Sequence, residues 1–355
     1  MCLVITRIFK SLLLAGLFLI VFACDNIGID ESQIIQNAKV HMDKGDLVAA
    51  SIELHNILQK NPDNAEARYL LGSVSLQAGD LASAEKELRK AAETGWKPEL
   101  IQLQLARTLI NKKSFRKLLD EIRPSDTWAI DTRANIAGLR APAEASLDDL
   151  DAARITLDEG RALNKHAVQI LRTTAILQIT GMLEGEASDT LRTAISLHPD
   201  DPEILLIDAA LSIKNHQLKH AADTYRRVIA RDSPRTVTTY GRAARISLAR
   251  LQIIEKHYDA ARTTLQPLLN NSRNDPEANY LAGLLALTMK DLPRAEDHAH
   301  KLLAVVPDNA PGQLLLGKIK YAQKDLEQAA RHLSNYLKSF PGDKEVRELL
   351  TNTYI

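Results

Sequence analysis

The sequence predicts an all-α protein, an α–α superhelical solenoid of about nine helix pairs behind an N-terminal signal or anchor segment. Three observations support this class. A small residue recurs about every 34 residues, and alanine follows it twelve positions later in eight of nine cases. Turn residues fall between these two positions. A charged start and an apolar run occupy the first 24 residues.

The repeat consists of nine units over residues 31–343. The units start near Glu31, Ala65, Glu99, Ala134, Val168, Pro202, Arg242, Pro276 and Ala310. The eighth residue of each is small: Ala38, Gly72, Ala106, Ala141, Ala175, Ala209, Ala249, Gly283 and Gly317. The twentieth is alanine except in the third unit: Ala50, Ala84, Leu118, Ala153, Ala187, Ala221, Ala261, Ala295 and Ala329. The register shifts by one residue before Ala134 and by six, residues 236–241, before Arg242.

This spacing is typical of two antiparallel helices that touch closely. Position 8 lies on the first helix and position 20 on the second, and a side chain no larger than methyl lets the two backbones approach. Position 24 lies one turn beyond position 20 on the same face and is mostly bulky and apolar, as in Leu54 and Leu88. These positions are therefore expected to form the core.

Turn signals fall where helix pairs require them. Gly45-Asp46, Gly79-Asp80, Lys290-Asp291 and Lys324-Asp325 lie between the two helices of a unit, and a proline closes several units. Pro142 is an exception, because it lies inside the expected first helix of the fourth unit, where it removes a hydrogen bond. We therefore expect a kink near residues 138–142 and the weakest local stability of the array.

The pattern of a small residue at position 8, alanine at 20, a bulky apolar residue at 24 and proline near 32 resembles the tetratricopeptide repeat. The resemblance covers residues 31–343 and implies a helical solenoid that binds other proteins. Residues 344–355 correspond to a half-unit or capping helix. The Trp and Tyr that the family places at positions 4 and 11 are mostly missing.

The N-terminus predicts export. Arg7 and Lys10 precede a 13-residue apolar run, too short for the roughly 20 residues of a spanning helix. Val21-Phe22-Ala23-Cys24 resembles the bacterial lipoprotein box, which implies a signal peptide at residues 1–23, acylation of Cys24 and a short linker at 24–30. Asp25 then implies retention at the inner membrane, facing the periplasm, rather than the outer membrane. The alternative is an uncleaved anchor over residues 3–24.

Neither the composition nor the motifs indicate nucleic-acid binding, catalysis or metal binding. Lysine plus arginine equals aspartate plus glutamate at 45 each, and aromatic residues make up 4%, so a nucleic-acid partner is not expected. No metalloprotease, hydrolase or nucleotide-binding motif is present. His216 and His220 have the spacing of metal ligands but no third ligand nearby. We therefore expect no catalytic residue, no metal and no cofactor, and treat an enzyme with a hidden site as a remote alternative.

The expected function is binding in the inner groove of the array, lined by positions 5, 9 and 12 of each first helix. An apolar groove with spaced cations suits a helix or extended peptide that carries acidic groups. The residues expected to contact a partner are Tyr69, Arg107, Arg172, Arg250, Tyr280, Lys318 and Tyr321. Alternatively, the apolar residues pack against neighbouring units and the cations are solvated.

A second resemblance concerns the cellular role. The Cys24-Asp25 signal, the unit that ends at Gly95-Trp96 and the segment 105–119 resemble the N-terminal part of the lipidated repeat proteins of exosortase (PEP-CTERM) and exopolysaccharide systems. This implies a membrane-tethered scaffold in a bacterial envelope assembly. The alternative is a pilus or outer-membrane assembly lipoprotein. A truncated family member would expose an apolar C-terminal end that promotes self-association.

Overall fold

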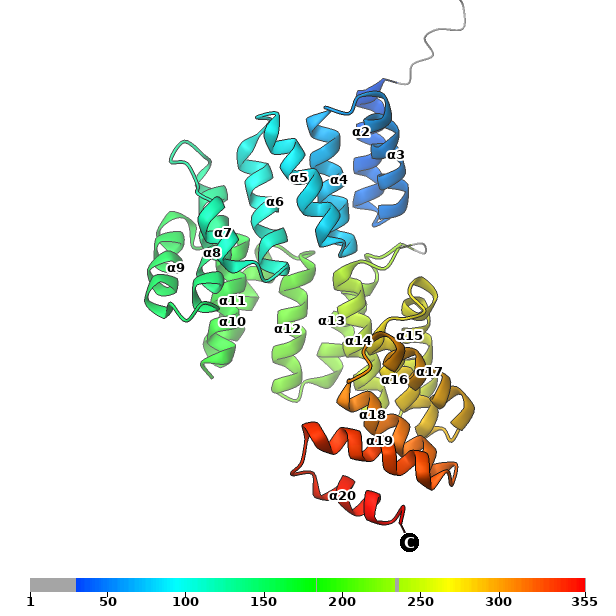
Figure 1. The fold of residues 1–355 in the computed structure, drawn as a ribbon. Coiled ribbons are helices and arrows are strands. Elements are labelled where there is room, and N and C mark those ends of the chain that lie inside the picture. Colours follow the sequence, from blue (N-terminus) through cyan, green and yellow to red (C-terminus); the bar gives the residue numbers. More distant parts are fainter. Residues whose placement is uncertain (1–29, 183, 234–235, 355) are drawn as a thin grey trace, which may run out of the picture.

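The computed structural model describes residues 30–354, except residues 183, 234 and 235 and the side chain of Glu184. These described residues form 19 helices and no strand, with one isolated bridge between Ser233 and Thr236. The helices pack in sequence order as a curved array (Figure 1), which confirms the all-α solenoid. The expected signal segment at residues 1–23, Cys24 and most of the linker at 24–30 lie outside the described residues.

Nine antiparallel helix pairs and one further helix make up the array. The first helices of the pairs are α2 (Glu31–Asp43), α4 (Ala65–Ala78), α6 (Pro98–Asn111), α8 (Ile130–Ala145), α10 (Val168–Thr180), α12 (Pro202–Lys214), α14 (Thr239–Ile254), α16 (Pro276–Thr288) and α18 (Ala310–Ala322). The second helices are α3 (Leu47–Lys60), α5 (Leu81–Glu93), α7 (Phe115–Glu121), α9 (Leu150–Asn164), α11 (Glu184–Leu197), α13 (Leu218–Ile229), α15 (Tyr258–Asn271), α17 (Leu292–Val305) and α19 (Leu326–Ser339). Helix α20 (Lys344–Thr351) follows the last pair.

Two first helices begin earlier than the repeat register suggests. Helix α14 starts at Thr239 instead of Arg242 because the Thr238 hydroxyl accepts a hydrogen bond from the Gly241 N–H, at 2.9 Å, and so caps the helix. Helix α8 starts at Ile130 instead of Ala134. The preceding α7 has only seven residues, because Ile122 turns extended just before Pro124.

The small residues meet as the repeat requires. Every residue at positions 8, 20 and 24 is buried. A Cβ added to Gly72 would lie 2.7 Å from Leu88 Cγ and 3.3 Å from the Ala84 carbonyl oxygen. Position 8 therefore packs directly on positions 20 and 24 of the second helix, and a larger side chain would push the helices apart.

Position 15 of every unit has a left-handed backbone, a regularity that the sequence pattern did not reveal. The nine residues with positive φ there are Gly45, Gly79, Lys113, Asp148, Met182, His216, Lys256, Lys290 and Lys324. The left-handed residue ends the first helix, and in five units the next residue is an aspartate that caps the second. Each turn reverses the chain within two to four residues.

Helix α8 continues through Pro142 to Ala145. Pro142 has no N–H to donate to the Gly138 carbonyl oxygen one turn earlier. That oxygen instead accepts a buried hydrogen bond from the Thr173 hydroxyl of α10, at 2.7 Å. Gly138 also permits this approach, since an added Cβ would lie 2.9 Å from the Ile170 backbone nitrogen. The weak local stability expected at this segment stays a prediction.

The array bends back on itself. In Figure 1, α12 to α14 lie beneath α4 to α6, and the chain from α13 to α14 lies close to the lower ends of α2 to α4. We call the described residues between α13 and α14, 230–233 and 236–238, the closing loop. The Thr239 hydroxyl, just beyond it, donates to the Gln77 carbonyl oxygen of α4 at 2.9 Å, and the Arg231 carbonyl lies against Gly45. The six-residue shift in the repeat register therefore contributes to a contact between the second and seventh repeats.

The closing loop is held by a buried carboxylate. Asp232 Oδ1 accepts hydrogen bonds from the Thr238 N–H at 3.0 Å and the Thr238 hydroxyl at 2.7 Å. Its other oxygen pairs with Arg245 of α14, and the Asp232 side chain is 1% exposed. A Cβ on Gly241 would overlap this carboxylate. The loop is thus fixed to the start of α14.

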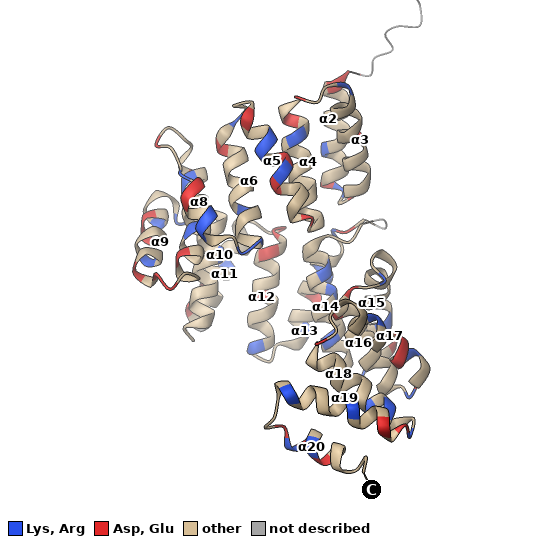
Figure 2. Cartoon of the chain, viewed as in Figure 1, with Lys and Arg blue, Asp and Glu red and all other residues tan. Residues whose placement is uncertain are grey.

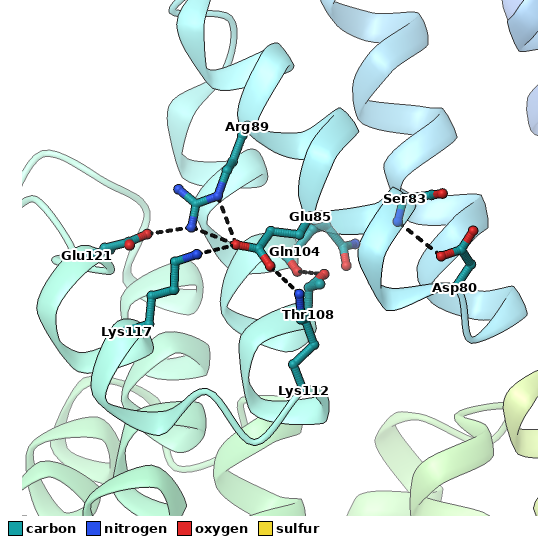
Figure 3. A network of polar contacts seen from close by, with 9 residues as sticks. All are labelled: Asp80, Ser83, Glu85, Arg89, Gln104, Thr108, Lys112, Lys117 and Glu121. Atoms are coloured by element: carbon teal, nitrogen blue, oxygen red, sulfur yellow. Dashed lines mark hydrogen bonds and ion pairs between the residues drawn. The ribbon is translucent and has the colours of Figure 1, made fainter.

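Charged residues of both signs are interspersed along the array (Figure 2). One cluster joins the second and third repeats (Figure 3), where Glu85 of α5 pairs with Lys112 and Lys117 at 2.6 Å and with Arg89 at 2.9 Å.

Among the helices that lie in the described part of the chain, none has both the length and the apolar character needed to cross a bilayer.

The Glu85 cluster predicts a loss of stability in acid. Burial raises the pKa of Glu85, but the hydrogen bonds from Lys112, Lys117 and Arg89 outweigh it and lower the pKa to about 2, from 4.5. The carboxylate therefore stabilises the fold above about pH 4.5, and this contribution is lost as the pH falls toward 2. In urea denaturation between pH 7 and 2.5, Glu85→Gln should be less stable at pH 7 and lose less stability on acidification than the wild type.

The matched control is Glu93→Gln, because Glu93 is exposed at the end of the same helix and no ion pair to it is found in the described chain. Its stability should follow the wild-type curve. An identical pH dependence for Glu85→Gln and the wild type would contradict the prediction.

Candidate functional site

The bend of the array encloses a cavity of about 640 Å³, which we call the central cavity. The first helix of each of the first seven repeats contributes to its wall, and the closing loop completes it. Its lining includes Met42, Ser73, Leu76, Gln104, Arg107, Ile110, Leu139, Gln169, Arg172, Asp201, Glu203, Arg231, Thr238 and Tyr240. Residues far apart in the sequence thus face one polar space.

Arg172 of α10 lines this cavity, and two carboxylates neutralise its charge. It is 5% exposed, its Nε donates to Asp201 Oδ1 at 3.2 Å, and its Nη1 lies 2.6 Å from Glu203 Oε2. Asp201 also caps α12 by accepting from the N–H groups of Glu203 and Ile204. Burial raises the pKa of Asp201, but the hydrogen bond and charge of Arg172, the Ile204 N–H and the charge of Arg107 together outweigh it and lower the pKa overall. The pair therefore joins the fifth and sixth repeats.

Tyr240 of α14 extends this network. Its hydroxyl donates to Glu203 Oε2 at 3.2 Å. Burial and the charge of Glu203 raise the pKa of Tyr240 to about 12, so the phenol stays protonated at neutral pH and remains a donor.

Arg107 of α6 differs from Arg172, because no carboxylate of the described residues lies within ion-pair distance of it. Its Nη2 donates to the side-chain oxygen of Gln169 at 3.3 Å, and the same oxygen accepts from Arg172 Nη1 at 2.6 Å. We assign this orientation of the Gln169 amide because its oxygen then accepts from both arginines. Burial lowers the pKa of Arg107, and the charge of Arg172 lowers it further. Most of the guanidinium donors thus face the cavity unused.

A second cavity of about 540 Å³, which we call the side cavity, adjoins the first between α8, α9 and α10. Ile110, Leu139, Gln169 and Arg172 line both cavities. The rest of the lining is mainly apolar and includes Ala141, Ala145, Leu157, Ile176 and Leu177. Ile176 and Leu177 are 44% and 49% exposed. A cavity of mixed polarity therefore adjoins a mainly apolar one.

The comparisons with known proteins agree with this architecture. A sequence model described as tetratricopeptide repeat matches residues 41–106 and 286–352. These two stretches are similar to the tetratricopeptide repeat. The comparison with curated proteins finds no match for this chain.

Two solved structures share the fold of this helical array. A structure of PilF from Pseudomonas aeruginosa is 14% identical, with a TM-score of 0.53, and the match covers 63% of this chain and 99% of PilF. A structure of PilW, described as a widely conserved type IV pilus biogenesis factor, is 18% identical, with a TM-score of 0.52, and the match covers 61% of this chain and 98% of PilW. At these identities the likeness shows the fold alone.

Of the expected contact residues, the helical array brings only Arg107 and Arg172 together. Tyr69 packs on Trp96, with ring centroids 5.4 Å apart, and Tyr280 packs between two core clusters of the last repeats. Arg250 is exposed and pairs with Glu277 at 3.1 Å. Lys318 lies 3.6 Å from Glu345, and Tyr321, three residues later, is partly buried. Neither cavity is lined by these five residues.

Sequence reasoning missed four polar residues of the central cavity: Gln169, Asp201, Glu203 and Tyr240. Asp201 precedes a proline-started helix, so the sequence marks it only as a cap. His220 bonds to Asp208 at 2.8 Å rather than to His216. In the described part of the chain, no three His, Cys, Asp or Glu side chains are grouped to hold a metal ion.

Proposed function

We propose that this tetratricopeptide array is a membrane-tethered scaffold, which binds peptide segments of protein partners along its inner surface in a bacterial envelope assembly. The tether is Cys24, proposed from the lipoprotein-like signal. The sequence resemblance favours an exopolysaccharide-export or exosortase-linked assembly.

One observation carries the binding function: the central and side cavities lie side by side and share lining residues, among them Ile110, Leu139, Gln169 and Arg172. Together they offer an apolar surface beside a few fixed polar groups, the arrangement found in ligand sites. A folded domain would not enter such a space. An extended chain with apolar side chains fits its width and chemistry better.

Assembly of a type IV pilus is the second candidate role. The observation that favours it is the fold shared with PilW, described as a pilus biogenesis factor, at a TM-score of 0.52. Both candidate roles require the same inner surface to bind protein segments.

The function is tested by crosslinking in living cells. A diazirine amino acid at Leu177, which lines the side cavity, should give discrete adducts in the membrane fraction, and mass spectrometry should map each adduct to a short segment of its partner. The partners' identities separate the two assemblies. In cells that carry Cys24→Ala, the same adducts should move to the soluble fraction.

The control position is Ile52 of α3, which is 56% exposed and lines neither cavity. It should give no adduct with the same segments. Equal adducts from residues 52 and 177, or none from residue 177, would refute binding at the inner surface.

A further inference from the structure

Arg107 is the feature of the central cavity that the fold does not explain. It is partly buried, it is repelled by Arg172, and its only hydrogen-bond partner among the described residues is the Gln169 amide oxygen, 3.3 Å away. A guanidinium has five N–H donors. Burying N–H donors without hydrogen-bond partners is unfavourable, and a charged group with a perturbed pKa beside a cavity is a candidate for a binding site.

The neighbouring carboxylates Asp201 and Glu203 attract Arg107 electrostatically, but neither bonds to its guanidinium. Both contact Arg172, and Glu203 also accepts the Tyr240 hydroxyl. Arg231 of the closing loop pairs with Asp200 at 3.4 Å. The unfilled positions around Arg107 therefore face the cavity, where an incoming acceptor can reach them.

The groups around Arg107 favour a carboxylate over a phosphate as the hydrogen-bond acceptor. A planar carboxylate matches the two parallel N–H groups of a guanidinium and carries one negative charge. A phosphate dianion would bring two charges close to Asp201 and Glu203 and would be repelled by them. The side cavity, which begins at Gln169 and Arg172, offers an apolar lining for the rest of the ligand.

We infer that Arg107 binds a carboxylate of a peptide, a C-terminal carboxylate or an acidic side chain, whose adjacent apolar residues occupy the side cavity. This inference rests on the proposed function and names the chemistry of the partner. Gln169 positions the Arg107 guanidinium between the two cavities. Arg172 stays paired with its own carboxylates and forms part of the wall.

The test uses the full-length protein in detergent and an array of random twelve-residue peptides. Each peptide is made with a free C-terminus, with a C-terminal amide, and as the amide with an aspartate near its end. The tightest binders are then titrated by fluorescence anisotropy. Wild-type protein should prefer a carboxylate-bearing form over the plain amide by about 10- to 100-fold, the range expected for charge-assisted hydrogen bonds. The preferred form identifies which carboxylate is bound.

Arg107→Gln should abolish this preference and leave affinity for the plain amide within about twofold. Its melting temperature should equal or exceed that of the wild type, because no ion pair is lost. The matched control is Arg250→Gln, at the same repeat position of the seventh unit but exposed and paired with Glu277. It should keep the full carboxylate preference.

The outcomes separate the two proposals. If peptides bind but the carboxylate makes no difference, or the preference survives Arg107→Gln, this inference is wrong and the peptide-binding function stands. If no peptide in any form binds the full-length protein, both fail. A clear fall in melting temperature for Arg107→Gln would assign Arg107 a structural role instead.

Discussion

Arg172→Gln should lower the free energy of unfolding by about 3 kcal/mol, near the low end of the range for breaking a buried ion pair. The Arg172 side chain is 6% exposed and faces Asp201 and Glu203, which are 18% and 37% exposed. Glutamine would leave both carboxylates without a counter-charge. Glu203 retains some contact with water, which keeps the effect from being larger. Urea denaturation at pH 7 measures it.

The comparison variant is again Arg250→Gln. Its ion pair with Glu277 joins two side chains that are 56% and 42% exposed, so its loss should cost less than about 1 kcal/mol. Hydrogen exchange should also show the Arg172 variant opening first at the joint between α10 and α12. Equal stability of the two variants would show that the pair in the cavity contributes no more than a surface contact.

Gly45→Ala should open the contact between the first repeat and the closing loop. Gly45 has a φ of +69°, where alanine costs about 1–2 kcal/mol, and its new Cβ would overlap the Arg231 carbonyl oxygen. A backbone oxygen cannot rotate away as a side chain can, so the loop must move. Hydrogen exchange in the closing loop should accelerate, and the radius of gyration from small-angle scattering should increase.

Gly95→Ala is the matched control for this variant. Gly95 has a nearly equal φ of +72°, yet an added Cβ there meets nothing within 4 Å. It should share the conformational cost and leave exchange in the closing loop unchanged. If both variants accelerate exchange in the loop equally, backbone strain and not the contact with Arg231 is responsible.

The repeat architecture was predictable because it depends on short-range periodicity. Gly72 and Ala84 are twelve residues apart and meet in the structure as their spacing implies. The turn at position 15 was harder to predict, since lysine or another non-glycine residue occupies it in most units. Its left-handed backbone follows from the packing of the two helices and not from the residue.

The cavity was only partly predictable. Arg107 and Arg172 follow from the expectation that positions 5 and 9 face inward, but the contact of Gln77 with Thr239 spans 162 residues. Such a contact depends on small rotations summed over five repeats, which local sequence does not encode. The three tyrosines were expected in the groove as amphipathic contacts. Tyr69 packs on Trp96 with tilted rings, and the contact of these tyrosines with a partner stays a prediction.

The contact between the second and seventh repeats divides the array mechanically. An open solenoid extends like a spring, because each repeat touches only its neighbours. Here the second and seventh repeats are joined by the Thr239–Gln77 hydrogen bond, so stretching or twisting the repeats between them first requires that bond to break. The eighth and ninth repeats and α20 follow this closed part of the array, and they remain as easy to deform as an open solenoid. A load applied at the C-terminal end would therefore deform those repeats before it reached the cavities.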